Sequence, residues 1–216
     1  MFNIIVVADD HDNIIGSNCQ RSYSYLSSQI DVTSYNMHLL TGEACQAANV
    51  QEAISSFQKQ KFILVAYSHG QSHALVSTYA TDGYVTLGMA PHFKTSLVYT
   101  NSCLTGLELM RALVSNDCHG YVGYTGLVRL PAREEDEMVF ITCENKGLIN
   151  FLTTDDTLTQ SIEVMKKFYA EKVKEFARKK MYVTAGRLQR NLNHLVHYDY
   201  NAIKRGDFIT DLQATS

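Results

Sequence analysis

Two short motifs in the first half of the chain carry side chains that can do covalent chemistry. The run ILVAYSHG brings Ser68 and His69, and the run LVYTNSCLTG brings Ser102 and Cys103. A thiol beside an imidazole is sufficient for acyl transfer, because the imidazole removes the thiol proton, the thiolate attacks a carbonyl and the imidazolium protonates the leaving amine. His69 is therefore the candidate base and Cys103 the candidate nucleophile.

A glycine follows the candidate base, which suits the oxyanion that forms in such a reaction. Gly70 has no Cβ, so its backbone N–H can approach the developing negative charge closely. The N–H of Cys103 is the second candidate donor. We also expect Cys103 to open a helix, where the helix dipole favours the thiolate.

Both motifs follow continuous apolar runs rich in β-branched residues, which are typical of buried parallel strands. Strands are predicted at residues 2–8, 31–37, 61–67, 95–101 and 120–126, and helices at residues 19–30, 43–60 and 105–115. Strands that alternate with helices indicate an α/β fold with a mostly parallel sheet. If the strands that end near His69 and Cys103 are neighbours, the two side chains face each other across the crevice at the carboxyl edge.

The segment between the two motifs differs from the rest, because residues 73–88 alternate in a way that predicts a β-hairpin. Its turn is expected at Asp82-Gly83, a dipeptide that favours hairpin turns.

After Pro131 the pattern becomes helical. Apolar residues recur at spacings of three and four from Leu158 to Phe176, which predicts one long amphipathic helix, and a second helix is predicted at residues 185–204. We expect residues 1–152 to form a catalytic core and residues 153–216 to form a helical extension packed on the same domain.

The composition excludes several classes of protein. The chain has 216 residues, of which 45% are hydrophobic and 19% charged, and its net charge of −3 gives no reason to expect a nucleic-acid or membrane partner. No run approaches the roughly 18 to 20 apolar residues of a membrane-spanning helix, and the N-terminus does not resemble a signal peptide, so we expect a cytoplasmic protein. Five cysteines without a CxxC pair argue against a disulfide framework and a structural metal.

The order of the motifs resembles the caspase, gingipain and separase group of cysteine peptidases. A strand ending in His-Gly is followed about 34 residues later by a strand ending in cysteine, and LVYTNSCLTG is most similar to the nucleophile turn of caspase-like CHAT domains. The hairpin, the GYVGYTG strand and the N-terminal VVADDHDNIIGS also fit. The resemblance covers roughly residues 2–150. It implies a caspase-like three-layer sandwich, hydrolysis of a protein or peptide substrate without cofactor or metal, and a dyad of His69 and Cys103.

The chain departs from the CHAT pattern in two places. Asn101 and Ser102 replace the usual small residues before the nucleophile, and the segment after about Leu152 has no counterpart in the family. CHAT domains often stand beside tetratricopeptide repeats, and none is present here. We therefore expect regulation by a separate protein partner.

Two acidic loops suggest which substrates such a site would choose. Asp10, Asp12 and Asp136 are the candidate substrate-binding residues, because the loops that carry them are expected to open onto the crevice and would favour a basic side chain. Three basic residues in the same regions, Arg21, Arg129 and Arg133, keep an acidic substrate possible as the alternative.

Three other interpretations remain. Ser68 lies in a sequence, AYSHG, that resembles the nucleophile elbow of serine hydrolases. His69 and His73 are spaced as metal ligands in a helix would be, but they lie in a predicted loop and strand, without a HExxH glutamate. The chain could also be a catalytically silent caspase-like domain that binds and regulates a partner.

Overall fold

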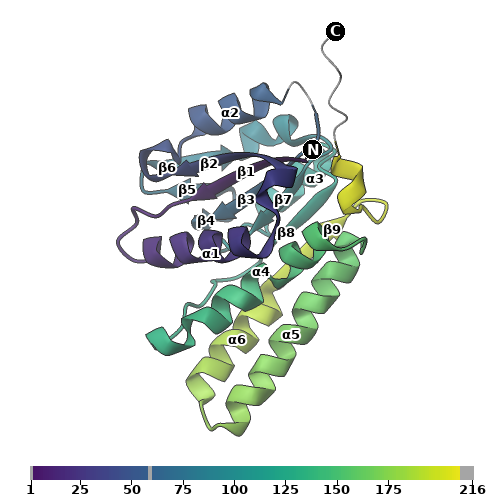
Figure 1. Ribbon diagram of the computed structural model, residues 1–216. Helices are drawn as coiled ribbons and strands as arrows, with labels where there is room; N and C mark the ends of the chain where they lie inside the picture. Colours follow the sequence, from purple (N-terminus) through teal and green to yellow (C-terminus); the bar gives the residue numbers. More distant parts are fainter. Residues whose placement is uncertain (1, 58–59, 210–216) are drawn as a thin grey trace.

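A six-stranded sheet runs through the centre of the molecule (Figure 1). The computed structural model describes residues 2–57 and 60–209. The strand order is β2-β1-β3-β7-β8-β9, and every pair is parallel except β8 with β9. The strands are β1 (Phe2–Ala8), β2 (Tyr35–Thr41), β3 (Phe62–Tyr67), β7 (Leu97–Thr100), β8 (Gly120–Tyr124) and β9 (Leu195–Asp199). This confirms the predicted α/β class with a mostly parallel central sheet.

Helices cover both faces of this sheet, which explains why its inner strands β1, β3 and β7 are largely apolar. In β1, Ile4 and Val6 belong to one core cluster and Ile5 and Val7 to another, because successive side chains point to opposite faces of a strand. The first cluster also contains residues of α1 (Gly16–Gln29), α4 (Glu137–Thr153), α5 (Leu158–Arg178) and α6 (Tyr182–His194). The second contains residues of α2 (Ala47–Ser56) and α3 (Glu108–Ser115).

The long helix α5 begins at a capping box formed by Thr157 and Gln160. Thr157 accepts a hydrogen bond from the backbone N–H of Gln160, and the Gln160 side chain accepts one from the N–H of Thr157, which makes a capping box. Helices α5 and α6 lie side by side and extend beyond the sheet (Figure 1). Short 3-10 helices also occur in the described chain, at η1 (Val32–Ser34), η2 (Gly42–Ala44), η3 (Leu87–Phe93), η4 (Glu134–Asp136) and η5 (Arg205–Phe208).

A second, antiparallel sheet contains the predicted hairpin, but its turn is not where we expected it. The strands are β4 (His69–Gln71), β5 (Ala74–Ser77) and β6 (Ala80–Thr86), so the chain turns at Thr78 and Tyr79. The Asp9 carboxylate fixes this turn by accepting hydrogen bonds from the N–H and hydroxyl of Thr78. Asp82 and Gly83 lie inside β6, where Gly83 has a φ of +109°.

The predicted helix at residues 185–204 is wrong in its second half. Helix α6 ends at His194, and Leu195–Asp199 forms β9, the edge strand of the main sheet. Pairing with β8, from Tyr124↔Leu195 to Gly120↔Asp199, satisfies the backbone of both segments and overrides the local helical pattern. The C-terminal part of the chain therefore contributes a strand as well as helices.

None of the helices within residues 2–57 and 60–209 combines the length and apolar character needed to cross a lipid bilayer.

Packing of α5 on the sheet predicts that the C-terminal helices unfold together with the strands. Ile162 is fully buried in the cluster that includes β1, whereas Ile14 is 79% exposed. We expect Ile162→Ala to lower the free energy of unfolding by about 2–5 kcal/mol in one cooperative urea transition. The matched change Ile14→Ala should cost less than about 0.5 kcal/mol. Two separate transitions, only one of which moves in Ile162→Ala, would contradict this prediction.

Candidate active site

The pairing of β3 with β7 brings the two motifs together. Ala66 lies opposite Thr100 at the end of this parallel pair, so the segments that carry the two motifs leave the sheet side by side. The Ser102 hydroxyl donates a hydrogen bond of 2.8 Å to the carbonyl oxygen of Ser68, which ties the two strand ends together. His69 and Cys103 line one cavity of about 130 Å³. The expectation that these strands are neighbours is confirmed.

Gly70 permits this close approach of the two turns. A Cβ atom at this position would lie 2.5 Å from the carbonyl oxygen of Cys103 and 2.7 Å from Cγ2 of Thr105. Both distances are shorter than a real Cβ tolerates, so only glycine fits here. The backbone of Gly70 therefore lies directly against the nucleophile turn, where an oxyanion donor would be needed.

Asp12 contacts His69 and so orients the candidate base. Its Oδ2 lies 3.1 Å from Nε2 of His69, and its Oδ1 accepts hydrogen bonds of 2.8 Å from the N–H groups of Ile14 and Ile15. Burial raises the pKa of Asp12, but the two amide donors and the His69 ring outweigh burial and hold the pKa below its usual value. With Nε2 directed at Asp12, Nδ1 is the ring nitrogen left for Cys103.

Cys103 is half-buried in a turn, and it does not open a helix as predicted. Helix α3 begins only at Glu108, and Leu104 has a φ of +62°, so the chain is not helical beside the thiol. The N–H of Val128 donates to the Cys103 sulfur at 3.3 Å. Burial raises the pKa of Cys103, although the Val128 N–H and the charge of Arg129 oppose this effect. Burial thus favours the neutral form of this thiol, so a nucleophilic role would call for a base beside it.

The loop after β8 is held over this thiol by helix α6. Arg129 donates its N–H to Oδ1 of Asn191 at 2.7 Å, and Nδ2 of Asn191 donates to the carbonyl of Arg129 at 2.9 Å. Arg187 adds a bond of 2.8 Å to the carbonyl of Leu130. The position of Val128 at the sulfur therefore depends on α6.

Ser68 also reaches the cavity, but its hydroxyl is occupied by other groups. It lies 2.7 Å from the hydroxyl of Tyr84, 3.3 Å from that of Ser102 and 3.0 Å from the carbonyl of His69. None of these groups can act as the imidazole base that a serine nucleophile needs. The geometry therefore favours Cys103 over Ser68.

The three predicted substrate-binding carboxylates are engaged within the chain. Asp10 accepts a hydrogen bond from the N–H of Gly42 at 2.8 Å, and Asp136 is buried against Arg133 and Thr184. Asp12 holds His69. The described residues that line the cavity do not include any of the three.

Glu144 lines the cavity, and the sequence analysis missed it. The side chain projects from α4 and is 1% exposed, and its Oε2 accepts a hydrogen bond of 3.1 Å from Nδ2 of Asn101, two residues before Cys103. Burial raises the pKa of Glu144 to about 7, against the hydrogen bond from Asn101, which lowers it. A single carboxylate in the largely apolar run of α4, from Met138 to Leu152, is the signal that could have identified it.

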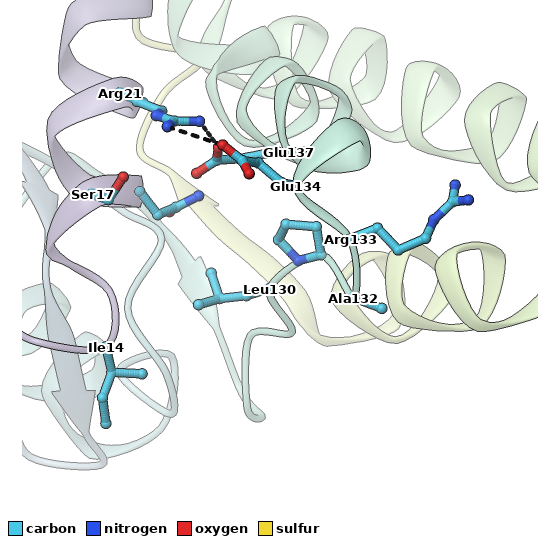
Figure 2. Close-up of a pocket in the computed structure, with 10 residues that line it drawn as sticks. Ile14, Ser17, Arg21, Leu130, Ala132, Arg133, Glu134 and Glu137 are labelled. Carbon is cyan, nitrogen blue, oxygen red and sulfur yellow. Dashed lines mark hydrogen bonds and ion pairs between the residues drawn. The ribbon is translucent and has the colours of Figure 1, made fainter.

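A second hollow adjoins the cavity and shares Asn18 and Leu130 with it. It has a volume of about 260 Å³ and lies between α1 and the loop that leads to α4 (Figure 2). Arg21 spans its upper side and makes ion pairs with Glu134 and Glu137. The second hollow therefore lies next to the cavity that contains the candidate nucleophile.

Comparisons of the chain with protein-family models, with curated proteins and with solved structures found no match. Within the part of the chain that the structure describes, His, Cys, Asp and Glu side chains do not form a group of three that could hold a metal ion.

The buried carboxyl of Glu144 predicts an unusual dependence of stability on pH. A carboxyl whose pKa is higher in the folded than in the unfolded state stabilises the fold at low pH, and this contribution is lost as the pH rises from about 4.5 to about 7. Relative to Glu144→Gln, wild type should lose on the order of 3 kcal/mol of unfolding free energy over this interval. Chemical denaturation at a series of pH values measures the difference.

The control for this experiment is Glu163→Gln, which removes an exposed carboxylate from α5. The unfolding free energy of this variant should change with pH as that of wild type does, from about pH 5 upward, because exposed ion pairs contribute little to stability. Parallel curves for wild type and Glu144→Gln over the same interval would contradict the prediction.

Proposed function

We propose that the protein is a cysteine endopeptidase with a caspase-like fold that makes limited cuts in a protein partner. The observation that carries this proposal is the meeting of His69 and Cys103 in one cavity at the carboxyl edge of β3 and β7. The resemblance of both motifs to CHAT domains supports it, and so does the small antiparallel sheet between them. The proposed enzyme acts in the cytoplasm, without cofactor or metal, under the control of a separate protein.

In the first half of the reaction, His69 takes the proton of Cys103 and the sulfur forms a bond to the substrate carbonyl carbon. The carbonyl electrons move onto oxygen, where the N–H groups of Gly70 and Cys103 are the proposed donors. The C–N bond then breaks, and the His69 imidazolium gives its proton to the leaving amine. The product is a thioester on Cys103.

Hydrolysis of the thioester completes the cycle. His69 removes a proton from water as the water oxygen attacks the thioester carbon, and the C–S bond breaks as the tetrahedral intermediate collapses. The proton returns to sulfur and the carboxylic acid departs. Asp12 does not touch the reacting atoms, and its proposed role is to hold the His69 ring and stabilise the imidazolium that forms in both halves.

Labelling with peptide acyloxymethyl ketones tests the proposal. The Cys103 sulfur should displace the carboxylate of the probe and form a thioether, seen as a mass increase of the intact protein. Probes ending in Arg and in Asp are compared. We expect labelling of wild type, none of Cys103→Ala, and a rate at least about a hundredfold lower in His69→Ala.

The matched variant Ser68→Ala separates the cysteine from the serine mechanism, because it should still be labelled on Cys103. Loss of labelling in Ser68→Ala but not in Cys103→Ala would favour the serine hydrolase. Absence of labelling in wild type by either probe would contradict the peptidase and favour a catalytically silent domain that binds its partner.

The contact between Asp12 and His69 predicts a positioning role. Asp12→Asn keeps a side-chain oxygen for the N–H groups of Ile14 and Ile15 but removes the charge beside the imidazole. The maximal labelling rate at saturating probe should fall at least about tenfold, while the probe concentration for half-maximal rate stays unchanged. Asp31→Asn, which changes a cap of η1, is the control and should leave both values unchanged. An equal fall in both variants would contradict the role of Asp12.

A further inference from the structure

The cavity beside Cys103 ends at a carboxyl group that lacks a full set of partners. Oε1 of Glu144 is buried and makes no hydrogen bond, whereas Oε2 accepts one from Asn101. The ion pairs among the described residues do not involve Glu144. A buried carboxylate without a cation is costly, so either the group is protonated at rest or a cation is supplied from outside.

A second polar group in the cavity is also unsatisfied. Nδ2 of Asn18, on α1, is buried and makes no hydrogen bond, and Asn18 lines the same cavity as Glu144. The oxygen and nitrogen of a carboxamide can exchange places by rotation of the side chain, so Asn18 can offer an acceptor as well as a donor. The cavity therefore holds one unsatisfied acceptor, on Glu144, and one unsatisfied donor, on Asn18. With the Asn18 carboxamide rotated, both side chains present acceptors to a ligand that carries several hydrogen-bond donors.

The remaining wall of the cavity suits an aliphatic stem. Ile15, Val128 and Leu130 contribute apolar surface to the same cavity as the carboxyl group. The volume of about 130 Å³ equals on the order of four water molecules, which matches one extended side chain and not a larger group. Lysine and arginine combine an apolar stem with a charged, donor-rich head, and they commonly bury the stem while pairing the head.

We propose that Glu144 binds the basic side chain of the substrate residue whose carbonyl Cys103 attacks. The inference rests on the proposed peptidase function and assigns the choice of substrate to α4 instead of to the acidic loops. Asn101 connects the proposed binding residue to the proposed nucleophile, because it donates a hydrogen bond to Glu144 and stands two residues before Cys103. A lysine or arginine head at Oε1 would neutralise the carboxylate and complete its hydrogen bonds, and Asn18 would accept a further N–H.

The test compares fluorogenic peptides that differ only in the residue before the scissile bond, which is Lys, Arg, Gln or Asp. Wild type should cleave the Lys or Arg peptide with a kcat/KM at least about thirtyfold higher than the Gln peptide, as expected for a desolvated charge pair. Glu144→Gln should lose this advantage, so that its kcat/KM values for the basic peptides and for the Gln peptide become similar. Glu163→Gln is the matched control on the surface of α5.

The outcomes separate this inference from the proposal on which it rests. In one outcome, turnover depends on Cys103, but Glu144→Gln lowers kcat/KM by the same factor on all four peptides. Glu144 would then only support the turn that carries Cys103, through Asn101. Cys103-dependent preference for Asp or Gln, unchanged in Glu144→Gln, would also overturn the inference and leave the peptidase intact. If Cys103→Ala and wild type are equally inactive on every peptide, the peptidase fails and the inference with it.

Discussion

The parallel register between β3 and β7 is the constraint on which the candidate site depends. A shift of one residue would displace the segment that carries His69 along the segment that carries Cys103, because both segments continue directly from the paired strands. The bond from the Ser102 hydroxyl to the carbonyl of Ser68 continues this register beyond the last paired residues. Gly70 then lets the following strand pass against the nucleophile turn. Apolar strands buried on both faces thus fix the separation of two polar side chains that make no hydrogen bond to each other.

The rest of the site is assembled from segments that come from both sides of these strands. Asp12 reaches His69 from the loop after β1, Glu144 closes the cavity from α4, and Val128 contacts the sulfur from the loop after β8. Each of the three is fixed by a further contact of its own, such as the hydrogen bond of Glu144 with Asn101. The geometry therefore depends on several segments that are distant in the sequence and meet only in the folded chain.

The sequence predicted the parts of this arrangement that depend on local patterns. Continuous apolar runs identified the strands that end near His69 and Cys103. The position of the hairpin turn and the placement of Glu144 depend on tertiary contacts, which no short stretch of sequence reveals. The hairpin turn is set by Asp9, far from Thr78 in the sequence, and this contact outweighs the turn preference of Asp82-Gly83. Glu144 escaped detection because α4 is buried on most sides, so its apolar residues do not mark one face.

Asn191, which binds the loop over Cys103, follows that cysteine by 88 residues in the sequence, and this has a consequence for protein synthesis. A ribosome adds roughly 5–20 residues per second, so Asn191 follows the cysteine by on the order of ten seconds. During that interval the nascent chain contains the thiol and the imidazole but lacks the helix that holds Val128 at the sulfur. Translation order alone thus delays completion of the site until α6 has been made.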